Sequence, residues 1–419
     1  MRITLWVSLA VVFYAYLGYP IVMWAFARWM RKRSSAAQIA PSVSIVLAVR
    51  NGMALLPRKM THLFNLDYPN IKEIIVVSDG STDGTAEFLA GLSDPRLKTV
   101  LLKEHGGKAV ALNAGMKEAT AEVLLFVDIR PEIAPGAIQR LVNHFADPNV
   151  GCVAGELVLV QNGHNAVPAA VGGLYWRYEQ WIRKCEAICD SPVGVYGGFY
   201  AIRRELAVPH PAGMILDDMF QPLSIIRQGF RSVIEPEACV YDEWPKKTQA
   251  EFHRKVRTLA GNFQLVQLAP WVLTPENRVV FQLFSHKILR LFVPYLFISI
   301  LVSSLLLAAG SRFYAALACA QVLALLLAVI GLRVRIPVVE RIAAPVGALL
   351  MLNVAAVVGL YKFLSTRRLL WRIWDAGTPA VAGDSAQNDS SQPSLSTSTA
   401  YVQPVSGGLI GDSTKGSVE

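Results

Sequence analysis

Residues 41–51 read PSVSIVLAVRN and residues 73–85 read EIIVVSDGSTDGT, two apolar, β-branched runs that each lead into polar residues. Two more such runs follow, LKTVLL at 97–102 and EVLLFVD at 122–128. Helical patterns lie between them, at 53–65, from Thr82 onward and at 109–118. Apolar strands that alternate with helices predict a mostly parallel sheet covered on both faces. The predicted fold class is therefore α/β.

Polar side chains follow three of these strands at the point where each strand ends. Arg50 and Asn51 follow the first strand, and Asp79 follows the second. Asp128 and Arg130 follow the fourth. In open α/β sheets, ligands bind in the crevice beyond the carboxyl ends of the strands. Most acids in loops are solvated turn residues, but two acids that each directly end a buried strand indicate a binding site.

A glycine-rich loop, Glu104-His105-Gly106-Gly107, leads into a helix that begins near Lys108. Glycines let the backbone approach a phosphate closely, and the amino-terminal end of a helix carries positive potential. Lys108 is therefore a candidate phosphate ligand. The Walker A spacing is absent, and no Gly-x-Gly-x-x-Gly follows the first strand, which argues against a dinucleotide-binding Rossmann domain. Taken alone, the loop is also compatible with a plain turn.

The second half of the domain contributes two charged clusters. Asp217 and Asp218 stand at the start of a helix-like run, where they are either functional acids or simple helix caps. Arg254 and Arg257 are three residues apart in a helical stretch and so share one face. That face is either part of the site or a stripe exposed to solvent or to lipid headgroups.

Seven motifs in this order resemble the membrane-bound glycosyltransferases of family 2, which include bacterial synthases of cellulose, hyaluronan and poly-N-acetylglucosamine. The resemblance covers residues 41–264 and the flanking membrane spans. It implies a GT-A fold that binds a nucleotide-diphospho-sugar, usually with Mg²⁺ or Mn²⁺. The motifs are PSVSIVLAVRN, IIVVSDGSTDGT, GGKAVALNAG, LLFVD, GGFYAIRREL, LDD and RKVRTLAGNFQ.

The resemblance assigns roles on the nucleotide side of the site. It implies that Asp79 pairs with the nucleobase, helped by Arg50 and Asn51. Asp128 matches the first acid of the Asp-x-Asp metal motif, and Arg130 stands where the second acid would be. Metal coordination would then rest on Asp128, the diphosphate and water, with Arg130 in contact with a phosphate.

The resemblance also assigns roles on the reaction side. Asp218 matches the general base of an inverting transfer, with Asp217 as its neighbour in the acidic pair. Arg254 and Arg257 match the family's Gln-x-x-Arg-Trp position near the diphosphate, although Arg254 replaces the Gln and Thr258 replaces the Trp. Since that motif accompanies processive synthesis, processive and single transfer both stay open.

The composition indicates membrane spans attached to this domain. Of the 419 residues, 53% are hydrophobic and 17% are charged, and the mean hydropathy is +0.38. Soluble domains carry about 25% charged residues. Four uncharged stretches are long enough to cross a bilayer: Ile3–Ala27, Leu291–Ser311, Phe313–Leu332 and Ile342–Tyr361.

These stretches divide the chain into five predicted parts. An N-terminal anchor (1–33) is followed by the cytoplasmic GT-A domain (41–264). An interfacial segment (265–290), a C-terminal membrane region (291–375) and a disordered tail (376–419) complete the chain. Trp244, Trp271 and Phe281–Phe284 are either interfacial aromatics or ordinary core residues.

Basic residues near the spans give conflicting topologies. A basic cluster at 28–33 favours an inner-membrane, multi-pass protein whose soluble domain is cytoplasmic. Three further spans would then place the C-terminus outside, yet a second basic cluster at 362–372 favours the inside. Either the preference of basic residues for the cytoplasmic side fails here, or one segment is re-entrant. Pro345 and Asn353 make the last stretch the candidate for a re-entrant segment.

The remaining predictions concern partners. The net charge of +9 suits cytoplasmic membrane flanks better than a nucleic-acid site. The expected partners are a nucleotide-sugar donor (UDP-linked by family analogy), a glycan or lipid-linked acceptor, the bilayer, and a second copy or an export partner. Cysteines without paired spacing are expected to be reduced core thiols, namely Cys152, Cys185, Cys189, Cys239 and Cys319.

An inverting glycosyltransferase is the leading function. A non-catalytic nucleotide-sugar-binding or scaffold subunit of a polysaccharide export complex is the alternative. A nucleotidyltransferase on a related sheet is disfavoured, because no glycine-rich pyrophosphorylase-type loop follows the first strand.

Overall fold

A computed structural model describes residues 1–30, 36–160, 167–243, 248–333, 337–366 and 370. The expectations that lie outside these residues are those on Arg31–Arg33, Trp244, Arg367, Arg368, Arg372 and the tail at 376–419.

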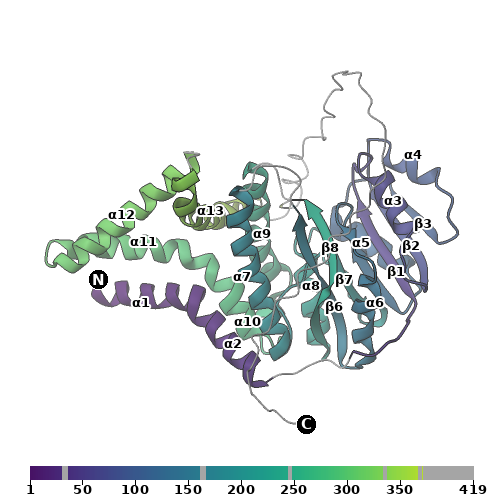
Figure 1. The fold of residues 1–419 in the computed structure, drawn as a ribbon, viewed down its shortest axis with the longest axis horizontal. Helices are drawn as coiled ribbons and strands as arrows, with labels where there is room; N and C mark the ends of the chain where they lie inside the picture. The colour runs from purple at the N-terminus through teal and green to yellow at the C-terminus, as the bar shows by residue number, and fades with distance from the viewer. Residues whose placement is uncertain (31–35, 161–166, 244–247, 334–336, 367–369, 371–419) are drawn as a thin grey trace, which may run out of the picture. The chain divides into compact units, whose positions relative to one another are not determined.

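An eight-stranded sheet forms the centre of the soluble domain, in the order β3-β2-β1-β4-β7-β6-β8-β5 (Figure 1). β3, β2, β1 and β4 are parallel to one another, and β7 is antiparallel to both β4 and β6. β8 is parallel to β6 and therefore runs in the direction of β4. The strands are β1 Val43–Val49, β2 Ile71–Asp79, β3 Leu97–Leu102, β4 Val123–Val127, β5 Glu132–Ile133, β6 Val150–Val160, β7 Phe199–Arg203 and β8 Arg231–Glu243.

Helices cover both faces of this sheet, as the uninterrupted apolar strands predict. Ile45 and Leu47 of β1 pack in one cluster with α3 (Leu56–Phe64) and α6 (Ala137–Val142). Val46, between them, points to the other face and packs with α5 (Lys108–Glu118) and α8 (Asp217–Arg227). Since neighbouring residues of a strand alternate between faces, each strand needs apolar residues throughout.

Two helices begin later than their sequence pattern predicts. α3 begins at Leu56, not at residue 53, and α4 (Thr85–Ala90) begins three residues after Thr82. The cause is local hydrogen bonding. The Asp83 carboxylate accepts from the backbone N–H groups of Met53 (3.0 Å) and Thr85 (3.1 Å), which fixes both chain segments in turns before either helix starts.

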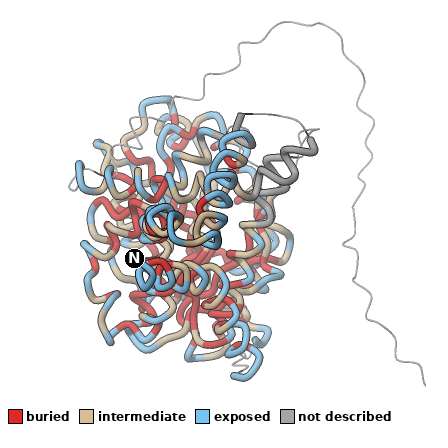
Figure 2. The backbone as a smooth tube through the Cα atoms, turned by 90° about the vertical axis from the view of Figure 1, so that its left-hand side faces the viewer, coloured by how far each residue is buried: buried red, intermediate tan, exposed pale blue. Residues whose placement is uncertain are grey.

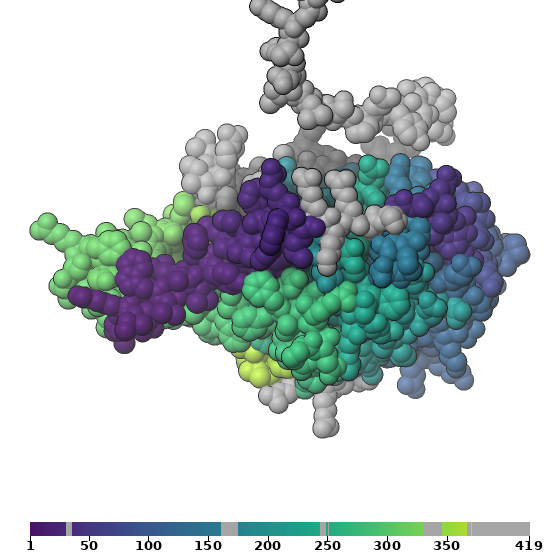
Figure 3. Space-filling model, turned by 90° about the horizontal axis from the view of Figure 1, so that it is seen from below, coloured from purple at the N-terminus to yellow at the C-terminus, as the bar shows by residue number. Residues whose placement is uncertain are grey.

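Four helices are long and apolar enough to cross a membrane: Arg2–Met30, Val280–Ala308, Arg312–Ile330 and Val346–Ser365. They comprise α1 (Arg2–Phe13), α2 (Tyr19–Met30), α10 (Val280–Leu283), α11 (Leu289–Ala308), α12 (Arg312–Arg333) and part of α13 (Pro337–Ser365). Figure 3 shows the N-terminal helix in purple beside the green membrane helices, of which α11 contacts α1. Figure 2 views this side of the molecule, where exposed, pale blue segments run along the helices.

Single π-helical turns interrupt two of these segments, at Tyr14–Gly18 and at Phe284–Ile288. α7 (Val167–Cys189) and α9 (Thr248–Leu268) lie between the membrane helices and the sheet (Figure 1). Trp271 packs against Phe220 of α8, with ring centroids 6.4 Å apart, so it belongs to the core, whereas Phe281 and Phe284 are exposed.

The prediction of buried core thiols is correct for three of the five cysteines. All five are free thiols, and Cys152, Cys185 and Cys189 are buried as expected. Cys239 is half-buried on β8, and Cys319 is exposed on α12.

Candidate active site

Asn51 joins the loops that follow β1 and β2. Its side-chain Oδ1 accepts a hydrogen bond from the Thr82 backbone N–H (2.9 Å), and its own N–H donates to Ser81 Oγ (3.2 Å). The residue has a φ of 48°, a left-handed conformation that asparagine tolerates better than most side chains. Arg50 is exposed beside it. Asn51 therefore shapes the predicted nucleotide end of the crevice.

Asp79 ends β2 and holds the glycine-rich loop. Its carboxylate accepts hydrogen bonds from the N–H groups of Gly106 and Gly107, both at 2.8 Å, and lies 2.8 Å from His105 Nδ1. A carboxylate has about four lone-pair sites, so a nucleobase N–H can still be accepted. The sequence pattern did not predict these hydrogen bonds, by which Asp79 holds the loop before Lys108 in place.

Lys108 connects the strand-end acid to the acidic pair. Its Nζ lies 3.2 Å from Asp128 Oδ1 and 3.1 Å from Asp217 Oδ2. Burial alone would lower the pKa of the ammonium, but the surrounding carboxylates raise it well above its usual range. Lys108 is therefore charged. Through its two ion pairs it links the start of α5 to the residue after β4 and to the start of α8.

Asp218 lies next to this ion-pair group. Burial and the charge of Asp217 together raise the pKa of Asp218 to about 7. A Cβ at Gly197 would lie 2.8 Å from the Asp218 Cβ, so glycine leaves the room that this side chain needs. The site thus holds a carboxylate whose pKa is close to neutral pH, beside a fixed cation.

Asp242 is a member of the site that the motif comparison missed. Its Oδ2 lies 3.2 Å from Arg130 Nη2. The negative charges of Asp242 and Asp128 also act on the ammonium of the buried Lys59. Lys59 donates to the Pro131 carbonyl at 2.6 Å, and burial lowers its pKa to about 8. The signal was present in the sequence, because Asp242 lies near the carboxyl end of a strand parallel to β4.

Comparison with known proteins identifies this architecture. Residues 44–208 match glycosyl transferase family 2. The chain carries a family 2 glycosyltransferase domain. Its GT-A fold is shown by a mannosyltransferase from Pyrobaculum calidifontis, solved with GDP-mannose and Mn²⁺, at 22% identity and a TM-score of 0.63 over 86% of this chain and 99% of that one.

Two relatives known by sequence are a synthase and a transferase whose names both contain N-acetylglucosamine. The chain is 24% identical over 229 residues to a poly-β-1,6-N-acetyl-D-glucosamine synthase of Staphylococcus aureus, covering 54% of this chain and 55% of the relative. It is 25% identical over 258 residues to an N-acetylglucosaminyltransferase of Neorhizobium galegae, covering 57% and 58%. The chain spans about half the length of the curated relatives that it matches.

Only one of the two predicted α9 arginines faces the acids of the glycosyltransferase domain. Burial and Asp217 raise the pKa of Asp218, and the charge of Arg257 partly opposes that rise. Arg254 instead pairs with Glu251 on its own helix, 2.7 Å away. Because the two arginines are three residues apart, they share a broad face but have different neighbours.

Buried polar residues line the inner side of the site and were also missed. His210 shares hydrogen bonds with Asn113, and burial lowers its pKa to about 4, so it is neutral. Tyr200 stacks on Phe126, with ring centroids 4.7 Å apart, and the charge of Asp217 acts on its hydroxyl. His210 stands outside the quoted motifs, and Tyr200 lies within GGFYAIRREL without an assigned role. Only the tertiary structure brings the two side chains to Asp217.

The residues present fit a divalent cation held by few protein ligands. Among the described residues, no group of three or more His, Cys, Asp or Glu could hold a metal ion. Asp128 has a side chain that is 41% exposed and can offer an oxygen, whereas Arg130 is paired with Asp242. A cation here would be bound by Asp128, with its other ligands from donor phosphates and water.

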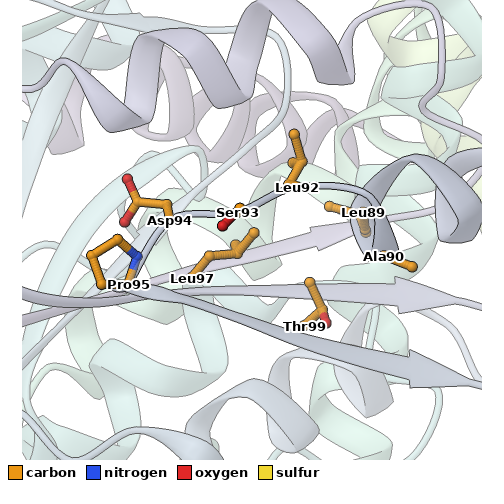
Figure 4. A pocket seen from close by; sticks show the side chains of 8 residues that line it. All are labelled: Leu89, Ala90, Leu92, Ser93, Asp94, Pro95, Leu97 and Thr99. Atoms are coloured by element: carbon orange, nitrogen blue, oxygen red, sulfur yellow. The ribbon is translucent and has the colours of Figure 1, made fainter.

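A separate surface hollow lies at the edge strand β3 (Figure 4). It has a volume of about 410 Å³. Residues of α4, of the loop that follows it and of the start of β3 line it, including Leu89, Asp94 and Thr99. The acids of the site stand at the other, carboxyl ends of the parallel strands. The hollow is therefore not part of the site.

Proposed function

We propose that this protein is an inverting glycosyltransferase that moves a sugar from a nucleotide-diphospho-sugar to a glycan or a lipid-linked acceptor. The observation that carries the proposal is the position of Asp218. This carboxylate has a pKa raised to about 7 and lies beside the ion-paired Lys108 at the carboxyl edge of a GT-A sheet. A general base works best when its pKa is near the operating pH.

In this mechanism Asp218 accepts the proton of the acceptor hydroxyl as that oxygen attacks the anomeric carbon. The glycosidic bond to the donor phosphate breaks on the opposite side, and the nucleoside diphosphate leaves with growing negative charge. Lys108 and Arg257 stabilise that charge from two sides. A divalent cation bound to Asp128 would supply further charge to the same leaving group.

The donor's nucleoside would occupy the crevice beside Asp79, Arg50 and Asn51. The loop contacts of Asn51 and Asp79 support this placement, because they hold the ends of β1 and β2 in fixed conformations. A UDP-linked N-acetylhexosamine is the first donor to test, since the relatives named above make N-acetylglucosamine products. We place the reaction at the cytoplasmic face of the inner membrane, where such donors are available.

The alternative is a non-catalytic subunit that binds a nucleotide sugar within an export complex. The ion pair between Arg130 and Asp242 favours it, because an arginine stands where the family's second metal-binding acid would be. In this case the donor is bound without being consumed.

The test is turnover of a panel of nucleotide sugars by the purified full-length protein in lipid nanodiscs. Release of nucleoside diphosphate with one donor, and its loss in Asp218→Asn, supports the transferase. Binding of a donor without release of its nucleotide, with Mg²⁺ or Mn²⁺ and membrane lipid present, would support the subunit and contradict the transferase.

A further inference from the structure

The last apolar segment, Val346–Ser365 of α13, passes the length and composition criteria for a membrane span. We propose that it does not cross the bilayer but lies on the membrane surface on the side of the catalytic domain. It would seat the active-site helix α9 on the lipid. The partner of its exposed face is then the lipid bilayer itself.

The C-terminal half of α13 packs directly on a helix of the catalytic domain. A Cβ at Gly359 would lie 3.0 Å from the Ala260 backbone N and 3.3 Å from the Val256 carbonyl oxygen. The rings of Phe263 and Phe363 stack with centroids 5.8 Å apart. α9 also carries Arg257 of the active site, so this part of α13 lies at the level of the catalytic domain and not across the bilayer from it.

The middle of the segment Val346–Ser365 also lies at the level of the catalytic domain. Asn353 faces the Tyr16 hydroxyl, on which the charges of Arg290 and Glu179 act. Arg290 and Glu179 form an ion pair at the domain end of α11. A 20-residue span is about 30 Å long, so its centre would lie near the bilayer midplane. Position 353 lies instead beside the Arg290–Glu179 pair, at the end of α11 that joins the catalytic domain.

The exposed face of the segment is apolar. Val354, Val357, Tyr361 and Leu364 are all exposed, and Tyr361 is 67% exposed. Their spacing of three, four and three residues places them on one side of the helix. Ala355, Ala356 and Gly359, on the side toward the protein, are buried.

Two features identify the bilayer as the partner of this stripe. The exposed apolar surface continues on α11 and α12, for example at Ile298 and Leu323, and both of these helices contact α13. Lys362 stands next to Tyr361, where its stem can follow the apolar surface while the ammonium reaches a lipid phosphate.

This placement removes the topological conflict in the charge pattern. With three crossing segments, the N-terminal anchor, α11 and α12, both basic clusters (28–33 and 362–372) fall on the side of the catalytic domain. Ser365, the last residue of α13, then lies on that side as well. α13 is one continuous helix, so a re-entrant loop is not required.

The first experiment determines the side of Ser365. In the full-length chain with Cys239→Ser and Cys319→Ser, single cysteines are introduced as Ser365→Cys, Lys117→Cys and Gly310→Cys. Lys117 is exposed on the catalytic domain, and Gly310 is exposed in the turn between α11 and α12. A membrane-impermeant maleimide is applied to spheroplasts and to inverted vesicles. We expect Ser365→Cys to label from the same side as Lys117→Cys; labelling from the side of Gly310→Cys overturns the proposal.

The second experiment measures depth. Val357→Cys carries a bimane in vesicles of phosphatidylcholine and phosphatidylglycerol brominated near the headgroup or deep in the acyl chain. Leu323→Cys, at an exposed position in the middle of α12, is the matched control. We expect strongest quenching of Val357→Cys by shallow bromines and of Leu323→Cys by deep ones. Deep quenching at 357 would indicate a span, and absence of quenching a protein partner; either result overturns the proposal.

Discussion

At the scale of single residues, the site depends on how two neighbouring acids differ. Asp217 is buried and paired with Lys108, so its charge is held by a partner. Asp218 is only partly buried, and burial and its neighbour raise its pKa. Two neighbouring acids in different environments commonly take different roles in one reaction. We therefore assign the proton transfer to Asp218 and a positioning role to Asp217.

The first prediction is that Asp218→Asn lowers the turnover of the transferase by roughly 100- to 10,000-fold, the usual contribution of a general base. Donor affinity, measured by calorimetry, should change little, because the base acts only when the acceptor reacts. Near-normal turnover in Asp218→Asn together with loss in Asp217→Asn would reverse the assignment. Activity in both variants would contradict the proposal of a general base.

The second prediction concerns pH. A base must be deprotonated, and the raised pKa means that Asp218 becomes protonated as the pH falls through about 7. We therefore expect kcat of the wild type to fall tenfold per pH unit on the acidic side of that value. Residual activity of Asp218→Asn should lack this acidic limb. A wild-type profile that is flat down to pH 5 would show that Asp218 is not the titrating group.

The third prediction separates the two strand-end acids. Asp79→Ala should weaken nucleotide binding with or without divalent metal, because Asp79 holds the loop and is the proposed partner of the base. Asp128→Ala should weaken binding mainly when Mg²⁺ or Mn²⁺ is present. Calorimetry with and without EDTA distinguishes them. Equal, metal-independent losses would rule out this division of roles.

At the scale of elements, the site is assembled by loops that touch through their backbones. Gly80 has a φ of +57°, and a Cβ there would lie 2.6 Å from the His105 backbone N. The turn after β2 and the loop before α5 are therefore in direct contact. The position of Lys108 depends on this contact, since Lys108 follows immediately after that loop.

The fourth prediction tests this contact. Gly80→Ala should displace the loop at 104–107 and weaken donor binding, as measured by calorimetry. Gly84→Ala is the matched control, because Gly84 also has a positive φ (+86°) but a Cβ there meets nothing within 4 Å. Both variants should lose about 1–2 kcal/mol to the left-handed conformation. Only Gly80→Ala should lose further stability and donor affinity; equal behaviour would mean that the contact is unimportant.

At the scale of the whole molecule, a buried polar network joins the catalytic domain to the membrane helices. His286 has no exposed side-chain surface; its two ring nitrogens lie 2.8 Å from Glu186 and 3.1 Å from Glu179. The Tyr19 hydroxyl donates to Glu186 at 2.5 Å, and Arg290 pairs with Glu179. The network thus ties the N-terminal helix, α7 and the start of α11 into one unit.

The fifth prediction is that His286→Ala destabilises the protein by about 1–3 kcal/mol, the cost of removing one hydrogen-bond partner from buried polar groups. Thermal unfolding in detergent measures the loss. Glu237→Gln is the control, because the Arg140–Glu237 pair is exposed and should contribute at most about 1 kcal/mol. A similar small effect for both variants would show that the network is not required for stability.

We also expect that the acceptor is held at the membrane surface by the segment between Gly261 and Arg290. Few crossing helices make a wide polymer pore within one chain difficult to build, because such helices must also satisfy one another's polar groups. Purified protein in nanodiscs of recorded oligomeric state should therefore add a sugar to an extractable lipid or require a second copy. Long, translocated polymer from a single monomer would exclude this arrangement.

The sequence by itself predicted the first four strands of the sheet and the acids at the carboxyl ends of two of them. A buried parallel strand needs an unbroken run of apolar residues. The first charged residue after such a run, for example Asp79 or Asp128, can therefore be recognised in the sequence. The spans were equally visible, since hydrophobic length alone defines a candidate.

Only the tertiary structure decided which of these residues meet. The partnership of Lys108 with Asp217, the place of Asp242 beside Arg130 and the packing of α13 on α9 join positions far apart in the chain. Local composition carries no signal for such contacts, because they arise when the elements pack. For the same reason, the sequence does not distinguish an apolar helix that lies on a membrane surface from one that crosses the membrane. The packing neighbours of the helix are needed to tell them apart.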